Sequence, residues 1–318
     1  MCRCVYKDDL HIDALHHVTI EHTPSLRRPG PVMNVSFRRE LKSFSRDPIE
    51  WAIAIRERWS DRSEHRSKGS RGPAFMPWPP CPYAIDDDWE ERLHEAVDAP
   101  WPCPTHDRFE PMWWELIDSM QAQVGDVGRG AFGQEGWGDT DAAMARIVYC
   151  MTSHMRPEHV LETGVARGIT TRFILEAIAE NGHGHLWSID LPPPGEPEIH
   201  DQIGMAVPDR LRPSWTYVSG SSRRRLRPLL SEIRPIDLFV HDSRHTQRNL
   251  MFELHHAWPA LTPRGVAIVD DVDLSCGFHE FRRTYPEART FVGRSEPLTP
   301  DIGRQDDSGV VAAALRPS

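Results

Sequence analysis

The spacing of hydrophobic positions changes near residue 139, where short apolar runs begin to alternate with longer amphipathic segments. Short apolar runs predict buried strands, and apolar residues at intervals of three and four predict helices. Strands that alternate with helices predict a doubly wound α/β domain, whose mostly parallel sheet has helices on both faces. The strand candidates are HVLET, HLWSID, WTYVS, IDLFVHD, GVAIVDD, RTFVG and GVVAAAL, and the helix candidates span residues 142–153, 169–180 and 246–261.

The first 138 residues follow a different pattern. Residues 1–45 are polar without a clear period, which predicts a flexible N-terminal tail. The sequence of residues 46–138 predicts a Trp- and Pro-rich extension, helical and irregular, that packs on the domain of residues 139–318. A lid or an assembly region is the alternative role of this extension. Asp47-Pro48 predicts the start of a helix with Trp51, Ile55 and Trp59 on one face. The prolines of residues 73–104 predict neither a regular helix nor a central strand there.

The most specific motif joins the first strand candidate to the next helix and reads Glu162-Thr163-Gly164-Val-Ala166-Arg-Gly168. Glycines in such a turn let a ligand approach the backbone at the N-terminus of a helix. The spacing lacks the central glycine that cradles a pyrophosphate in dinucleotide-dependent enzymes. An acid at the strand end is better suited to a cationic amino-acid group than to a pyrophosphate.

Two later strand ends carry polar groups of the kind that bind a nucleoside. Asp190 lies 22 residues after Gly168, where nucleotide-binding α/β domains hold ribose hydroxyls. Ser221 and Ser222 follow the strand WTYVS and are placed to meet the edge of an adenine. The alternative for all three residues is ordinary turn chemistry.

Carboxylates also end the next two strands. Asp242 begins the segment Asp242-Ser-Arg-His245, and Asp270-Asp271 follows GVAIV. If these strands are neighbours, three carboxylates meet at one edge of the sheet and raise one another's pKa values, unless a cation such as Mg²⁺ is bound. His245 is a candidate proton acceptor near neutral pH. Helix capping is the alternative for Asp242 and Asp271.

Composition limits the classes of function. Lys and Arg total 37 against 47 Asp and Glu, and the net charge of −10 argues against sequence-independent binding of nucleic acid or anionic membranes. No apolar stretch approaches the roughly 20 residues of a membrane span, so we expect a cytoplasmic protein. No lysine follows Lys68, which excludes phosphate-loop and Schiff-base lysines from the α/β domain. The six cysteines lack paired zinc-ligand spacing and predict reduced thiols.

Residues 139–315 resemble a class I S-adenosylmethionine-dependent methyltransferase, through ETGVARG, SID, HDSRH and VDD. The resemblance implies a Rossmann-like seven-stranded sheet. It implies cofactor binding by Glu162, Thr163, Gly164, Ala166, Gly168, Asp190, Ser221 and Asp242.

The later segments are similar to metal-dependent O-methyltransferases that act on sugars of natural products, and to their cephalosporin-tailoring relatives. This similarity implies Mg²⁺ bound by Asp242, Asp270 and Asp271, with His245 as the general base. The chain departs from the family at Asp270, where Glu is frequent, and at Ser243-Arg244, where Gly-Asp is frequent.

We therefore expect methyl transfer from S-adenosylmethionine to a hydroxyl of a small-molecule acceptor, a sugar or a secondary metabolite. We expect no nucleic-acid or membrane partner, and homo-oligomer formation stays open. The alternatives are a metal-independent methyltransferase, a non-catalytic cofactor-binding or scaffold protein and, disfavoured by the glycine spacing, an NAD-dependent oxidoreductase. We interpret His241, His255 and His256 as structural, and the RRRLR run at 223–227 as a solvated turn.

Overall fold

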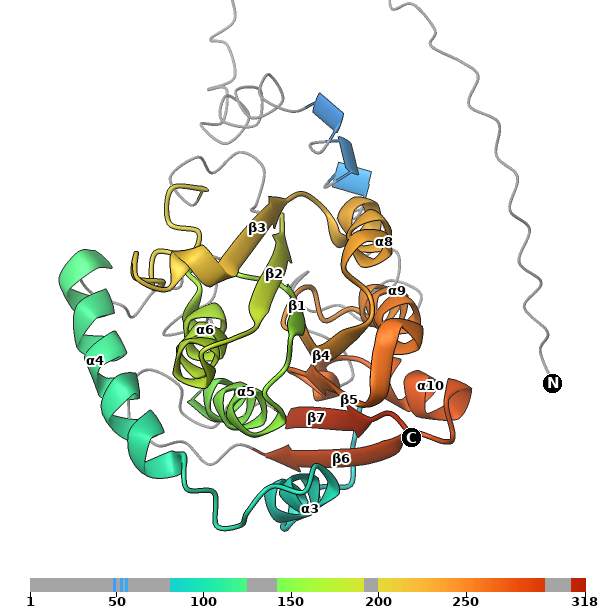
Figure 1. The fold of residues 1–318 in the computed structure, drawn as a ribbon. Coiled ribbons are helices and arrows are strands. Elements are labelled where there is room, and N and C mark those ends of the chain that lie inside the picture. Colours follow the sequence, from blue (N-terminus) through green and yellow to red (C-terminus); the bar gives the residue numbers. More distant parts are fainter. Residues whose placement is uncertain are drawn as a thin grey trace, which may run out of the picture.

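The computed structural model describes residues 48–49, 52–53, 55–56, 81–124, 142–191, 200–294 and 310–318. Its central feature is a seven-stranded sheet with the order β3-β2-β1-β4-β5-β7-β6 (Figure 1). Strands β1 to β5 pair in parallel, whereas β7 pairs antiparallel with both β5 and β6. The sheet confirms the predicted fold class, and all seven strand candidates form strands. They are β1 His159–Thr163, β2 His185–Asp190, β3 Trp215–Ser219, β4 Ile236–His241, β5 Leu261–Val269, β6 Arg289–Arg294 and β7 Val310–Leu315.

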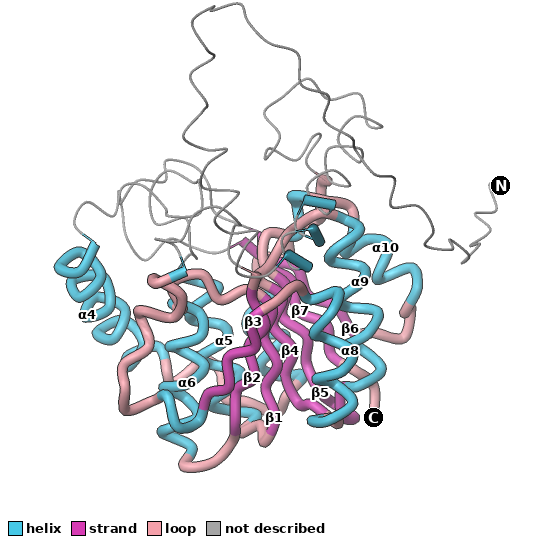
Figure 2. Tube along the Cα trace, turned by 90° about the horizontal axis from the view of Figure 1, so that it is seen from above, coloured by secondary structure: helices cyan, strands magenta, loops and turns pink. Residues whose placement is uncertain are grey.

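Helices cover both faces of the sheet (Figure 2). Helices α5 (Ala142–Met155) and α6 (Ile169–Asn181) lie on one face, and α8 (Ser222–Ile233), α9 (Gln247–Ala257) and α10 (Gly277–Thr284) lie on the other. The alternation of side chains along β1 explains the two cores, because Val160 packs with the α5–α6 side and Leu161 with the α8–α9 side. Three short 3₁₀ helices complete the described domain: η1 Arg212–Ser214, η2 Trp258–Ala260 and η3 Val272–Leu274.

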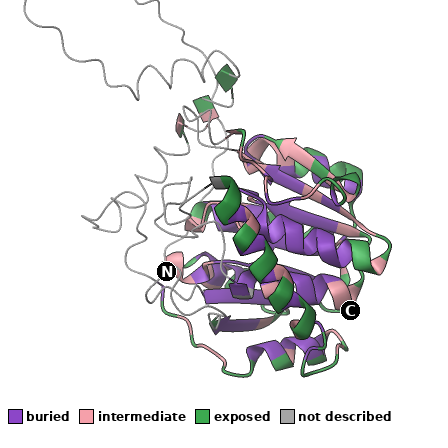
Figure 3. Cartoon of the chain, turned by 90° about the vertical axis from the view of Figure 1, so that its left-hand side faces the viewer, coloured by how far each residue is buried: buried purple, intermediate pink, exposed green. Residues whose placement is uncertain are grey.

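Residues 81–124 pack on this domain through two further helices. Helix α3 (Trp89–Ala96) lies against β6, and α4 (His106–Val124) lies across α5 and α6. The rings of Phe109 and Trp113 on α4 lie 4.7 and 5.9 Å from the ring of Phe173 on α6. The outer face of α4 is exposed (Figure 3). This part of the extension therefore shares the hydrophobic core of the domain, while the boundary at residue 138 lies outside the described residues.

Two expectations about secondary structure are wrong. Helix α3 lies inside residues 73–104, because the segment 83–99 is free of proline and long enough for two helical turns. The RRRLR run is not a solvated turn but the first half of α8, whose N-cap is Ser221. Leu226, Leu230 and Ile233 of α8 are buried, and their spacing of three and four residues forms the apolar face.

The expectation of reduced thiols is wrong for one pair of cysteines. Cys81 and Cys276 form a disulfide between residues 195 apart in sequence, whereas Cys103 and Cys150 are reduced. Cys276 is the N-cap of α10, and Cys81 is the first residue of the continuous segment 81–124. The disulfide therefore links the extension covalently to the α/β domain.

The remaining helix boundaries differ only slightly from the expected ones. Helix α5 continues to Met155, and α9 ends at Ala257, where Trp258-Pro-Ala forms η2. Of the helix expected from Asp47, the six described residues in 48–56 are helical and the others lie outside the described residues. Within the described ranges, no helix combines the length and the apolar character that crossing a bilayer requires.

Candidate functional site

The candidate site lies where the strand order reverses. From β1 the chain builds outward to β2 and β3, and it then returns to place β4 and β5 on the other side of β1. Ligands of open α/β sheets bind at the carboxyl ends of the strands at such a switch point. The ends of β1, β2, β4 and β5 bring Glu162, Asp190, Asp242 and Asp270 to this edge.

The glycine loop after β1 requires its two glycines for steric reasons. Gly164 has φ +90°, and a Cβ there would lie 1.9 Å from the carbonyl oxygen of Asp242. Gly168 has φ +84°, and its Cβ would lie 2.8 Å from the Cα of Gly204. Ala166 between them also has a positive φ of 48°. The loop can therefore lie directly against the segment after β4, and against Gly204 between β2 and β3, only with glycine at these two positions.

The side chains of three predicted cofactor residues make local hydrogen bonds. Asp190 Oδ2 accepts from the backbone N–H of Val165 at 3.1 Å and of Ala166 at 2.9 Å. Burial raises the pKa of Asp190, and these two hydrogen bonds oppose the shift. Thr163 donates its hydroxyl to Glu253 at 2.6 Å, and Ser221 caps α8. Asp190 thus fixes the conformation of the glycine loop.

Glu162 is fully buried at the end of β1. Its Oε2 accepts hydrogen bonds from Ser188 at 2.6 Å and from Thr171 at 2.8 Å. Its Oε1 has no hydrogen-bond partner among the described residues. Burial raises the pKa of Glu162 to about 8, against the effect of the two hydroxyls. A cation beside Oε1 would stabilise the ionised carboxylate.

A group of possible metal ligands lies between the ends of β4 and β5. One atom each of Asp242, His245 and Asp270 lies within 4.8 Å of the others. Asp242 Oδ2 accepts from the hydroxyl of Thr170 at 3.1 Å. Burial, followed by the charges of Glu162 and Asp271, raises the pKa of Asp242 well above its ordinary value.

The structure places Asp271 differently from the other predicted metal ligands. Its Oδ2 lies 3.9 Å from Nε2 of His245, while the group of mutually close ligand atoms contains Asp242, His245 and Asp270. Asp271 has φ +47°, which turns the chain immediately after Asp270. Burial lowers the pKa of His245, and its Nδ1 has no hydrogen-bond partner in the described chain. A neutral His245 can act as a base or as a ligand.

Comparison with known proteins identifies the domain. Residues 161–272 match the model of a family described as a methyltransferase domain. Residues 161–272 therefore carry the sequence pattern of a methyltransferase domain. The matched segment of this methyltransferase domain runs from β1 to η3 and includes every site residue predicted from the sequence.

The sequence of the chain matches no curated protein. Among solved structures, the O-methyltransferase TomG from Streptomyces achromogenes, in complex with SAM, is 13% identical, with a TM-score of 0.45 over 63% of this chain and 89% of TomG. An O-methyltransferase from Bacillus cereus, in complex with SAH, is 14% identical, with a TM-score of 0.46 over 72% of this chain and 99% of that protein. Similarities at this level add nothing about the activity of this methyltransferase domain.

The methyltransferase domain also contains a buried polar network that the sequence analysis missed. Glu253 on α9 accepts from Thr163, from Ser243 at 3.0 Å and from Asn249 at 3.0 Å, and its Oε2 lies 2.6 Å from Nδ1 of His241. Burial would raise the pKa of Glu253, but His241 and the hydroxyl donors lower it to about 2. Glu253 lies on the same helical face as the buried residues Leu250, Leu254 and Ala257. A charged residue among apolar positions of a helix indicates a buried polar network, so the sequence pattern could have revealed Glu253.

Proposed function

We propose that this chain transfers a methyl group from S-adenosylmethionine to a hydroxyl of a small molecule, a sugar or a secondary metabolite, with a divalent cation. The observation that carries the proposal is the position of Glu162, Asp242, His245 and Asp270. These residues meet at the switch point of the sheet, inside the segment that matches a methyltransferase domain.

The glycine-loop side of the site fits the cofactor. S-adenosylmethionine supplies an activated methyl group and carries cationic ammonium and sulfonium centres. Glu162 Oε1 is a buried acceptor without a described partner, which suits a cationic group. Asp190 already holds the loop, and we assign to it contact with the ribose hydroxyls as well. Ser221, at the start of α8, is the candidate neighbour of the adenine.

The other side of the site fits a divalent cation. The pKa of Asp242 is raised because its carboxylate is buried near other acids, and a cation would reverse that effect. A bound Mg²⁺ would lower the pKa of the acceptor hydroxyl. Oxygen ligands favour Mg²⁺, so we assign the ion to the carboxylates of Asp242 and Asp270. Neutral His245 then takes the proton from the acceptor, while Asp271 stabilises the protonated ring.

The first test is calorimetry of the full chain with S-adenosylhomocysteine. We expect saturable binding that is lost in Glu162→Lys and Gly164→Val and unchanged in Glu232→Gln, because Glu232 is exposed at the C-terminal end of α8, next to the amino end of β4 and away from the glycine loop. Absence of binding to a folded wild-type protein, judged by circular dichroism, contradicts the proposal.

The second test measures transfer of a labelled methyl group to a panel of hydroxylated sugars and phenols, with Mg²⁺ and after exhaustive chelation. We expect His245→Gln and Asp270→Asn to reduce the turnover number about 10²-fold or more while S-adenosylhomocysteine still binds. Turnover that survives chelation and Asp270→Asn would favour the metal-independent alternative. Cofactor binding without transfer to any acceptor, and without effect of His245→Gln, would favour the scaffold alternative.

A further inference from the structure

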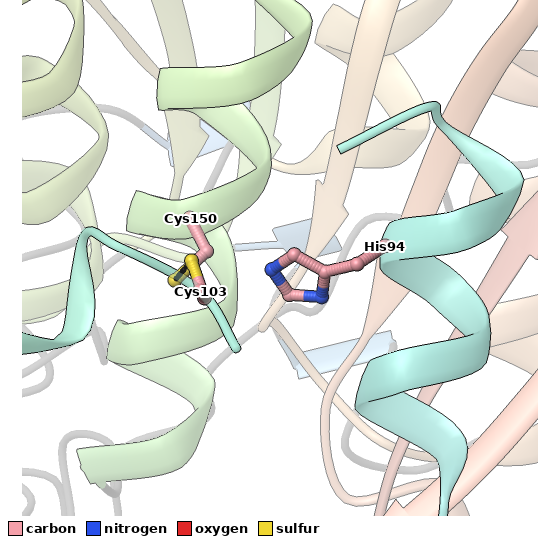
Figure 4. A group of neighbouring side chains, drawn as sticks. All are labelled: His94, Cys103 and Cys150. Atoms are coloured by element: carbon pink, nitrogen blue, oxygen red, sulfur yellow. Dashed lines mark hydrogen bonds between the residues drawn. The ribbon is translucent and has the colours of Figure 1, made fainter. Parts of the chain in front are cut away.

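A second group of metal-ligand residues lies outside the methyltransferase site. His94 on α3, Cys103 in the following loop and Cys150 on α5 are buried, and one ligand atom of each lies within 4.8 Å of the others. Figure 4 shows the ring of His94 reaching from α3 toward the two sulfur atoms. A fourth donor is His154, one helical turn after Cys150, whose Nε2 lies 3.2 Å from Sγ of Cys103.

We propose that His94, Cys103, Cys150 and His154 form a structural zinc site that fastens the N-terminal extension to the methyltransferase domain. Two thiolates and two imidazoles are a donor set that zinc binds in tetrahedral structural sites. The site could not be predicted from the sequence because three separate segments contribute to it. Only Cys150 and His154 are four residues apart on one helix, where two side chains can bind the same ion.

The hydrogen bonding of His94 indicates that Nε2 is the ring nitrogen that can bind a metal. Nδ1 of His94 lies 2.7 Å from the backbone carbonyl oxygen of Glu90. A carbonyl oxygen can only accept, so Nδ1 carries a proton and donates it. Nε2 is buried, and no described residue offers it a hydrogen bond. A ligating histidine commonly donates its second N–H to a carbonyl in this way, which fixes the ring.

The environment of the sulfurs favours a thiolate. The hydrogen bond between Cys103 and Cys150 lowers the pKa of Cys103, and the neighbouring His154, His94 and Thr105 add to this effect. The same contact raises the pKa of Cys150. A divalent cation in this buried space would stabilise both sulfurs as thiolates.

The distances also suit a metal better than a second disulfide. The two sulfurs lie 3.3 Å apart. A disulfide requires about 2.05 Å. Tetrahedral zinc with bonds of about 2.3 Å places two sulfurs about 3.8 Å apart. The two sulfurs therefore need to separate by only about half an ångström to reach the spacing of a zinc site.

The position of the group points to a structural role. His154 lines a pocket together with Glu158, Asp237 and Thr262, which lie at the amino ends of β1, β4 and β5. The candidate active site lies at the opposite, carboxyl edge of the sheet. All four zinc positions would be filled by side chains, as in structural rather than catalytic sites.

The test measures bound zinc in the full chain by mass spectrometry after loading and desalting, in a Cys2→Ser/Cys4→Ser background that removes the other close cysteine pair. We expect about one ion per chain. The ion should be lost in Cys103→Ser and Cys150→Ser. It should be retained in two controls: His183→Gln, because His183 is a surface histidine, and Asp270→Asn, because Asp270 belongs to the carboxylate group at the opposite edge of the sheet. Folded wild-type protein that holds no zinc, or zinc retained in Cys103→Ser, overturns the proposal.

Cobalt provides a readout that does not depend on the folding of variants. Co²⁺ bound to the unsubstituted chain should give a thiolate-to-cobalt charge-transfer band and the intense visible bands of a tetrahedral site. Only the weak bands of six-coordinate cobalt would place the ion among carboxylates and overturn the proposal. A Cys103–Cys150 disulfide, found by peptide mapping of protein purified without oxidant, overturns it as well.

Discussion

Glu253→Gln tests the buried network beside the candidate active site. The carboxylate of Glu253 has no exposed surface. Burial raises its pKa, but His241 and the hydroxyl donors lower the pKa from the ordinary 4.5 to about 2. A shift of this size corresponds to about 3 kcal/mol in favour of the charged form. Glutamine keeps the shape of the side chain but removes the charge and replaces one acceptor oxygen with a donor. We expect the free energy of unfolding at neutral pH to fall by about 3 kcal/mol.

The pH dependence follows from the direction of the shift. Because the pKa of Glu253 is lower in the folded than in the unfolded chain, its contribution is complete above about pH 4.5 and is lost as the pH falls toward 2. The difference between wild type and Glu253→Gln should therefore shrink to about 2 kcal/mol at about pH 3.5.

Urea denaturation followed by circular dichroism at the two pH values gives both numbers. The matched control is Glu232→Gln, because Glu232 is an exposed acid on the neighbouring helix α8, and it should change the stability by less than about 0.5 kcal/mol. The reasoning fails if Glu253→Gln is as stable as wild type at neutral pH, or if its deficit is the same at both pH values.

Three other predictions concern the loop, the cofactor and the disulfide. Gly164→Ala should destabilise the chain at least about 2 kcal/mol more than Gly182→Ala in urea denaturation, because both have positive φ but a Cβ at Gly182 meets nothing within 4 Å. Affinity for S-adenosylhomocysteine should rise with pH up to about 8, because binding of a cation ionises Glu162, and calorimetry of Glu162→Gln should show no such rise. Cys276→Ser should lower the unfolding free energy by about 2–5 kcal/mol under oxidising conditions only, and an equal loss in reductant would contradict the disulfide with Cys81.

The sheet could be predicted from the sequence because its strands are short apolar runs whose ends carry acids. Val160 and Leu161 face opposite cores, and only a strand buried on both faces needs two such residues in succession. Helix α8 was missed because the arginines at 223–225 conceal the apolar face that begins at Leu226. Helix α3 was missed because prolines flank a segment that itself contains none.

The site was predictable to the extent that it depends on neighbouring strand ends. The proximity of Asp242 and Asp270 follows from the pairing of β4 with β5. The third possible metal ligand beside Asp242 and Asp270 is His245 rather than Asp271 because of the turn after Asp270, where φ of Asp271 is positive. The hydrophobic pattern of the sequence does not predict that turn. The grouping of His94 with Cys103 and Cys150 likewise depends on tertiary packing of the extension.

The buried acids at the site edge differ in charge because they differ in donors. Glu253 receives hydrogen bonds at both oxygens and faces His241, which together outweigh burial and keep it ionised. Glu162 receives two hydroxyls on a single oxygen, and burial keeps it protonated near neutral pH. Asp242 has one hydroxyl donor and a raised pKa. The protein itself satisfies the charge of Glu253, whereas burial disfavours the charged forms of Glu162 and Asp242. Glu253 therefore stabilises this edge of the sheet as a carboxylate, whereas a cation bound beside Glu162 or Asp242 would stabilise their charged forms.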